Sequence, residues 1–105
     1  MSRLVVEEAG PATSVQDAGR VGALRFGLSS AGAMDRFALA AANALVGQLP
    51  DAAAIEIGPL AARFSAAEGP IRLALYGAPR ETRVGERTLP LARSFVLKPG
   101  ETLAL

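Results

Sequence analysis

Cysteine, histidine and tryptophan are absent from the 105-residue sequence, whose only aromatic residues are four Phe and one Tyr. Without Cys and His, these residues form no thiolate nucleophile, no Ser-His-Asp triad, no Cys/His zinc site and no disulfide. Any metal would have to be a hard ion bound by oxygen, and no residue stands out as a ligand for one. The lack of cysteine and of a signal-peptide pattern predicts a cytoplasmic protein.

Neither sign of charge dominates the sequence. Eleven Lys and Arg oppose ten Asp and Glu, for a net charge of +1, and the basic residues are scattered singly from Arg3 to Lys98. Binding to nucleic acid needs clustered cations, so we expect no nucleic-acid partner. The longest apolar segment, residues 37–47, is far shorter than the roughly 20 residues that cross a bilayer, so we expect no membrane partner.

Half of the residues are hydrophobic and a fifth are charged, as in a soluble globular protein. Short β-branched or alternating runs predict strands over residues 3–8, 53–57, 60–64 and 71–76. Turn residues predict two hairpins. One joins residues 82–84 to 87–89 through Gly85-Glu86, and the other joins 94–97 to 102–105 through a Pro-Gly turn. We expect the last strand to present an unpaired edge, as in an incomplete domain.

A single helix is predicted over residues 34–46, because this segment is rich in alanine and is followed by Gly47. Apolar side chains lie on almost every side of it, which predicts a helix that is mostly buried. Asp35 is suited to the N-cap, where a carboxylate accepts free backbone N–H groups. The fold class is therefore mainly β with one buried helix.

Four blocks follow one another in the sequence: TSVQDAGR (13–20), GLSSAGAMDRFALAAANALVG (27–47), DAAAIE (51–56) and LYGA (75–78). Together they resemble the N-terminal portion of the biotin-dependent carboxyltransferase family. This family includes allophanate hydrolase subunit 2, the KipA-like proteins and the C subunit of 5-oxoprolinase. Three positions depart from the family pattern: Ala31 replaces a serine, Gln48 an asparagine and Tyr76 a threonine.

The resemblance implies that residues 1–105 are the N-terminal, incomplete portion of a carboxyltransferase domain with a cyclophilin-like β-barrel. It implies a cytoplasmic hetero-oligomer with a subunit-1-like protein, similar to KipI or to the B subunit of 5-oxoprolinase. The implied activity is that of a hydrolase, the ATP-dependent opening of 5-oxoproline, or carboxyl transfer from carboxybiotin to an amide or urea nitrogen. ATP or carboxybiotin would be bound together with the partner. The alternative is a KipA-like regulatory protein that binds a kinase-inhibitor partner.

Three polar residues in the glycine-rich segment 13–30 are the first candidate site. Gln16 offers an amide, Asp17 a carboxylate and Arg20 a guanidinium that can bind a carboxylate or phosphate through two hydrogen bonds. Arg20 and Gln16 are candidate catalytic residues and Asp17 a candidate substrate-binding residue, forming a clamp for substrate or carboxybiotin. The alternative is that Asp17 and Arg20 pair with each other or bind backbone groups of the loop.

The helix contributes two further candidates. Asp35 either caps the helix or, as a catalytic residue, orients the reacting nitrogen. Asn43 either faces the substrate or, as a buried amide, joins the helix to neighbouring loops.

Gly32 and Glu56 complete the set of candidate substrate-binding residues. Gly32 either approaches a ligand closely or only makes a turn. Glu56 lies between two isoleucines of a predicted strand, so it faces away from them. It is either an exposed carboxylate or a partner for Arg20 or Arg63.

Overall fold

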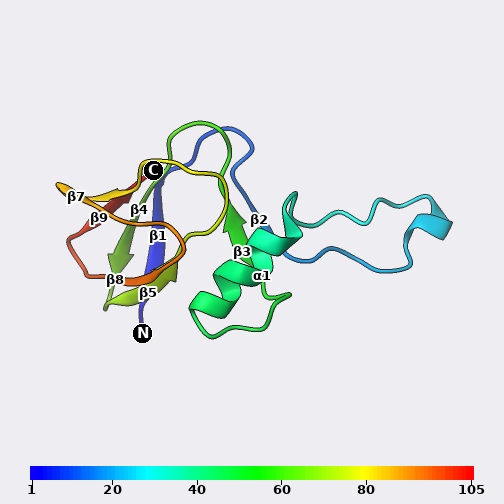
Figure 1. Ribbon diagram of the computed structural model, residues 1–105, viewed down its shortest axis with the longest axis horizontal. Coiled ribbons are helices and arrows are strands. Elements are labelled where there is room, and N and C mark those ends of the chain that lie inside the picture. Colours follow the sequence, from blue (N-terminus) through cyan, green and yellow to red (C-terminus); the bar gives the residue numbers. More distant parts are fainter.

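Short strands dominate the computed structural model, which describes residues 1–105 (Figure 1). The strands are β1 (Arg3–Glu8), β2 (Ser14–Gln16), β3 (Ala54–Glu56), β4 (Arg63–Ala67), β5 (Ile71–Ala74), β6 (Arg83–Val84), β7 (Arg87–Thr88), β8 (Ser94–Leu97) and β9 (Thr102–Ala104). One helix, α1 (Arg36–Leu45), and one 3-10 turn, η1 (Leu24–Phe26), complete the fold. The predicted class, mainly β with one helix, is confirmed. Strand β2 and turn η1 were not predicted, because both lie in a glycine-rich segment without periodicity.

The strands form three separate antiparallel sheets. The largest has the order β1-β4-β9-β6-β7, and the two others are the pairs β2-β3 and β5-β8. Within these residues the sheets do not close into a barrel. The large sheet lies at one end of the molecule, and α1 lies beside β2 and β3 (Figure 1).

Only one of the two predicted hairpins forms. Val84 pairs with Arg87 across Gly85-Glu86, and Gly85 has a φ of 60°, as a two-residue hairpin loop requires. The second hairpin is wrong, although its strands and its turn are present. Strand β8 pairs with β5, and β9 pairs with β4 and β6. The turn sets only the local change of direction, whereas burial of apolar faces decides which strands pair.

The prediction of an unpaired C-terminal edge is also wrong. Strand β9 lies between β4 and β6 in the largest sheet. Leu105 extends the pairing, because its N–H and C=O groups bond to the C=O and N–H of Ala62 at 2.9 and 3.2 Å. The last residues of the chain are therefore among its best-paired ones.

The core is small and centres on β4. Strand β4 buries Phe64 and Ala66 while Arg63 points to solvent, which is the alternation expected of a half-buried strand. Partners of these side chains come from strands far along the chain. The buried cluster consists of Ala62, Phe64, Ala66, Val84, Leu97 and Leu103.

Helix α1 begins as predicted but is less covered than predicted. The Asp35 Oδ1 atom accepts the N–H of Ala38 at 2.9 Å, so Asp35 is the N-cap. Only Leu39 and Asn43 are buried, and Phe37 is 71% exposed. The expectation of a mostly buried helix is therefore wrong for this chain, because no element packs against the far side of α1.

Glycine ends the helix, as predicted. Gly47 has a φ of 75°, and its N–H bonds to the C=O of Ala44 at 3.1 Å, while that of Gln48 bonds to the C=O of Asn43 at 2.8 Å. These two bonds form a Schellman motif, in which a left-handed residue satisfies the last free carbonyl groups. No helix of the structure is long and apolar enough to span a bilayer.

Between β2 and α1 the chain forms a long arm, residues 17–34, that projects away from the sheets (Figure 1). Two backbone hydrogen bonds join its outgoing and returning halves near its base. The N–H of Arg20 donates to the C=O of Ser30 at 2.7 Å, and the N–H of Ala33 donates to that of Asp17 at 2.8 Å. The arm is therefore an ordered projection with a defined base.

Two glycines allow this close approach. Gly19 and Gly32 have φ values of 85° and 89°, and a Cβ atom on Gly32 would lie 2.6 Å from the backbone nitrogen of Gly19. No side chain fits at either position. Gly32 is thus a site of close approach between backbones.

Replacing Gly32 by alanine tests this crossing. Gly22→Ala is a matched control, because Gly22 also has a positive φ but its Cβ would meet no atom within 4 Å. We expect Gly22→Ala to lower the free energy of unfolding by about 1 kcal/mol. Gly32→Ala should cost several times more and abolish the slow amide exchange of Arg20 and Ala33. Equal effects of the two substitutions would contradict this description.

Leu97 tests the core. Its side chain is fully buried, so Leu97→Ala should lower the free energy of unfolding by about 2 to 5 kcal/mol, as measured by denaturant titration. Leu49→Ala makes the same change at an exposed position and should have little effect. A loss at Leu97 no larger than at Leu49 would show that this cluster is not the core.

Candidate functional site

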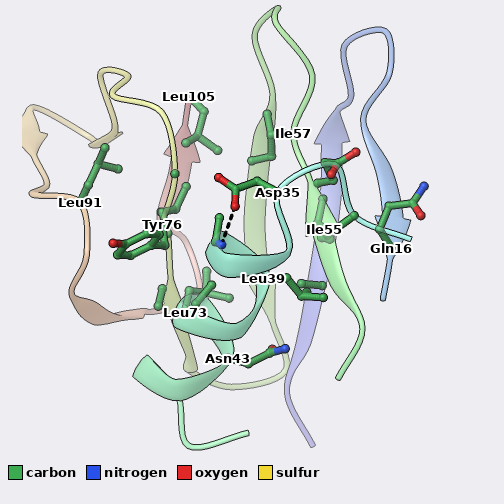
Figure 2. A pocket seen from close by; sticks show the side chains of 18 of the residues that line it. Gln16, Asp35, Leu39, Asn43, Ile55, Ile57, Leu73, Tyr76, Leu91 and Leu105 are labelled. Carbon is green, nitrogen blue, oxygen red and sulfur yellow. Dashed lines mark hydrogen bonds between the residues drawn. The ribbon is translucent and has the colours of Figure 1, made fainter. Parts of the chain in front are cut away.

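A mostly apolar hollow lies between α1 and the strands β3 and β5, with a volume of ≈ 860 Å³ (Figure 2). Aliphatic side chains such as Leu39, Ile55 and Leu73 form its walls. Polar side chains are few and spaced around these walls, which is the usual composition of a small-molecule site. They are Gln16, Asp35, Asn43, Gln48, Glu56, Arg72, Tyr76 and Arg80.

Asp35 and Asn43 lie at opposite ends of the helix that borders the hollow (Figure 2). Because Asp35 uses Oδ1 to cap the helix, its Oδ2 atom is left to accept a further hydrogen bond. The Asn43 amide group donates to the C=O groups of Pro50 and Ala52 at 3.2 and 2.9 Å. Asn43 thus joins α1 to the following loop, which is the structural alternative expected for a buried amide.

Glu56 and Gln16 come to the hollow from the pair β2-β3. The Glu56 Oε2 atom accepts the N–H of Met34 at 2.7 Å, so β3 holds the base of the arm next to the helix. The predicted pairing of Glu56 with Arg20 or Arg63 is wrong, because Arg63 pairs with a glutamate on β1 and Arg20 binds backbone in the arm. The Gln16 amide donates to the hydroxyl of Ser14 at 3.0 Å.

Asp17, Arg20 and Gly32 lie in the base of the arm and do not line the hollow. The Asp17 Oδ1 atom accepts the N–H of Gly19 at 2.8 Å. The Arg20 Nε atom donates to the C=O of Ser29 at 2.5 Å. The two side chains bind backbone groups of the loop, as the structural alternative expected, and form no ion pair with each other. The seven candidates thus divide into a hollow group of four and an arm group of three.

The sequence analysis missed two residues that line the hollow. Tyr76 packs edge-to-face against Phe37, with ring centroids 5.7 Å apart. The Arg80 guanidinium donates to the C=O groups of Gly58 and Leu60 at 3.0 and 3.1 Å. Tyr76 could have been found as the only tyrosine, directly after the clearest strand. Arg80 gave no signal, because its acceptors lie about 20 residues away.

The hollow is suited to a small, planar and uncharged group. Nowhere in the chain do three Asp or Glu side chains converge, so the carboxylates act singly as hydrogen-bond acceptors. Asp35 offers such an acceptor and Tyr76 a hydroxyl that both donates and accepts. Apolar walls strengthen hydrogen bonds to a ligand by excluding water.

Comparisons with known proteins agree on one family. The family model described as carboxyltransferase domain, subdomain A and B, matches residues 26–105. The chain is 38% identical to the C subunit of 5-oxoprolinase from Escherichia coli (strain K12) over 104 residues, covering 97% of this chain and 33% of that protein. It is 50% identical to the corresponding 5-oxoprolinase protein of Haemophilus influenzae (strain ATCC 51907 / DSM 11121 / KW20 / Rd) over 44 residues, covering 42% of this chain and 14% of that protein.

Solved structures show the same fold. One crystal structure of TTHA0988 superposes with a TM-score of 0.87 at 29% identity, covering 95% of this chain and 20% of that one. A second gives a TM-score of 0.86 at 28% identity, covering 95% of this chain and 37% of that one. This chain spans a third or less of the length of the curated relatives it matches. With the family model matched over most of its length, the chain belongs to the carboxyltransferase domain family, subdomain A and B.

Proposed function

We propose that this chain is the N-terminal portion of a carboxyltransferase-like subunit that takes part, with a partner subunit, in ATP-dependent opening of the lactam 5-oxoproline. The observation that carries the proposal is the 38% identity to the C subunit of a 5-oxoprolinase, which extends over nearly the whole chain. The aligned length includes almost every residue of the hollow. Carboxyl transfer from carboxybiotin to an amide or urea nitrogen is the related reaction, because its substrates carry the same planar N–C=O group.

The proposed role of the hollow is to bind and orient this planar group. The free Oδ2 atom of Asp35 accepts the N–H of the lactam, and the Tyr76 hydroxyl donates to its carbonyl oxygen. Glu56 positions Asp35 indirectly, because it holds the N–H of the preceding Met34. The apolar walls exclude water, so these hydrogen bonds orient the group more strongly than they would in solvent.

The residues of the hollow do not fit ATP. Phosphate groups need several cationic or N–H donors. The only cations in the hollow are Arg72, which donates to the Ser94 hydroxyl at 3.1 Å, and Arg80, which donates to two carbonyl groups. We therefore assign no step on ATP to these residues. The uncharged ureido ring of biotin fits the hollow better, since it carries a planar N–C=O group of its own.

A KipA-like regulatory role is the second candidate. Asp17 and Arg20, the charged members of the predicted clamp, are both engaged by backbone groups of the arm. A chain whose conspicuous charged residues hold a projecting arm is also suited to binding another protein. Such a chain would assemble with its partner without turning over a substrate.

Asp35 gives a sharp test of the enzymatic proposal. Asparagine is as good an N-cap as aspartate, so Asp35→Asn keeps the helix and removes only the carboxylate charge. We expect the polypeptide in its full encoded length, purified with a partner that resembles the B subunit of 5-oxoprolinase, to form glutamate from 5-oxoproline and ATP. Asp35→Asn should lower kcat by about 100-fold. Tyr76→Phe keeps the ring and should lower kcat less.

Asp51→Asn is the control, because this exposed carboxylate lies outside the hollow. It should leave turnover unchanged. Full turnover by Asp35→Asn would remove Asp35 from the site. A complex that forms but turns over neither 5-oxoproline nor a urea or amide substrate would favour the regulatory candidate.

A further inference from the structure

The tip of the arm, residues 21–28, exposes a group of apolar side chains. Leu24 is 73% exposed, Phe26 is 71% exposed, and Val21 and Leu28 are also open to solvent. The turn η1 at this tip buries none of its residues. Single exposed apolar residues are common, but four within eight positions at the end of a projection indicate a contact surface.

The tip is already held in one conformation. The N–H groups of Phe26 and Leu28 both donate to the C=O of Ala23, at 3.0 and 3.2 Å, and Gly27 closes the turn on Leu24 at 2.9 Å. At the base, the crossing of two glycine backbones sets the direction of the arm. Because the backbone is ordered before contact, a partner that receives the tip has little conformational entropy to remove.

The arm and its base are positively charged. Arg20, Arg25 and Arg36 take part in none of the four ion pairs of the chain. The Arg25 guanidinium lies 4.8 Å from the centre of the Phe26 ring, so the tip presents one cation beside its largest apolar group. A surface that complements this tip is apolar at its centre and carries carboxylates at its rim.

We infer that the tip of the arm inserts into an apolar, carboxylate-rimmed pocket of the partner subunit. This inference rests on the proposed function, which includes such a subunit. A second copy of this chain fits the tip poorly. Four of its glutamates are already in ion pairs, and the two carboxylates of its hollow, Asp35 and Glu56, already accept backbone N–H groups. An anionic membrane fits poorly as well, because the tip has no Trp or Tyr and only one cation.

The test measures, by titration calorimetry, binding of the full-length polypeptide to the purified partner protein of the same organism, the one that resembles the B subunit of 5-oxoprolinase. Leu24→Asp should raise Kd by at least about 30-fold, the effect of losing one hot-spot side chain. Leu49→Asp is the matched control, because Leu49 is 74% exposed and lies outside the arm. It should change Kd by no more than about twofold. Arg25→Glu should weaken binding by about tenfold and reduce its dependence on salt, whereas Arg25→Lys should not.

Each other outcome contradicts a different statement. A wild-type complex that Leu24→Asp leaves intact would overturn the inference while keeping the proposed function. Failure of the wild type to bind would overturn the proposed function and the inference with it. If Leu24→Asp lowers the Tm of the full-length chain alone by several degrees, the tip packs within its own chain and the inference is wrong. Binding of the wild type to anionic phosphatidylserine vesicles, abolished by Leu24→Asp, would assign the tip to a membrane instead.

Discussion

Burial of one face of β4 is the constraint on which the rest of the fold depends. Phe64 and Ala66 of this strand meet Leu97 and Leu103 in the only buried cluster, and β4 pairs with β1 on one side and β9 on the other. Apolar burial is the main favourable term in folding, so the strands order themselves around this face. The pairing of β9 with β4 also leaves β8 to pair with β5, which forms one wall of the hollow.

The two groups of candidate residues have different physical origins. Asp35 and Glu56 reach the hollow because a helix start and a short strand lie side by side, joined through the N–H of Met34. Asp17 and Arg20 are directed at backbone groups because a narrow glycine crossing leaves the arm few other hydrogen-bond partners. Conspicuous polar residues in a glycine-rich loop can thus stabilise the loop itself, and their chemistry alone does not separate that role from catalysis.

Prediction succeeded where neighbouring residues decide the structure. The bounds of β1, the N-cap at Asp35, the glycine after α1 and the Gly85-Glu86 hairpin all follow from side chains within a few positions of one another. It failed for the second hairpin and for the covering of α1, because both depend on which distant surfaces meet. Of the site, Asp35, Glu56 and Gln16 were found from residue type, whereas Arg80 was missed because it acts on carbonyl groups distant in sequence.

The sequence by itself determined the local elements, the exclusion of Cys and His chemistry, and, through four ordered blocks, the family. These properties depend on residue identity and short spacing, which no packing can change. Only the tertiary structure decided the order of strands in the large sheet, the hollow beside α1 and the projecting arm with its apolar tip. Each of these arises from contacts between segments far apart in the chain, where burial and steric fit, rather than local preference, select the arrangement.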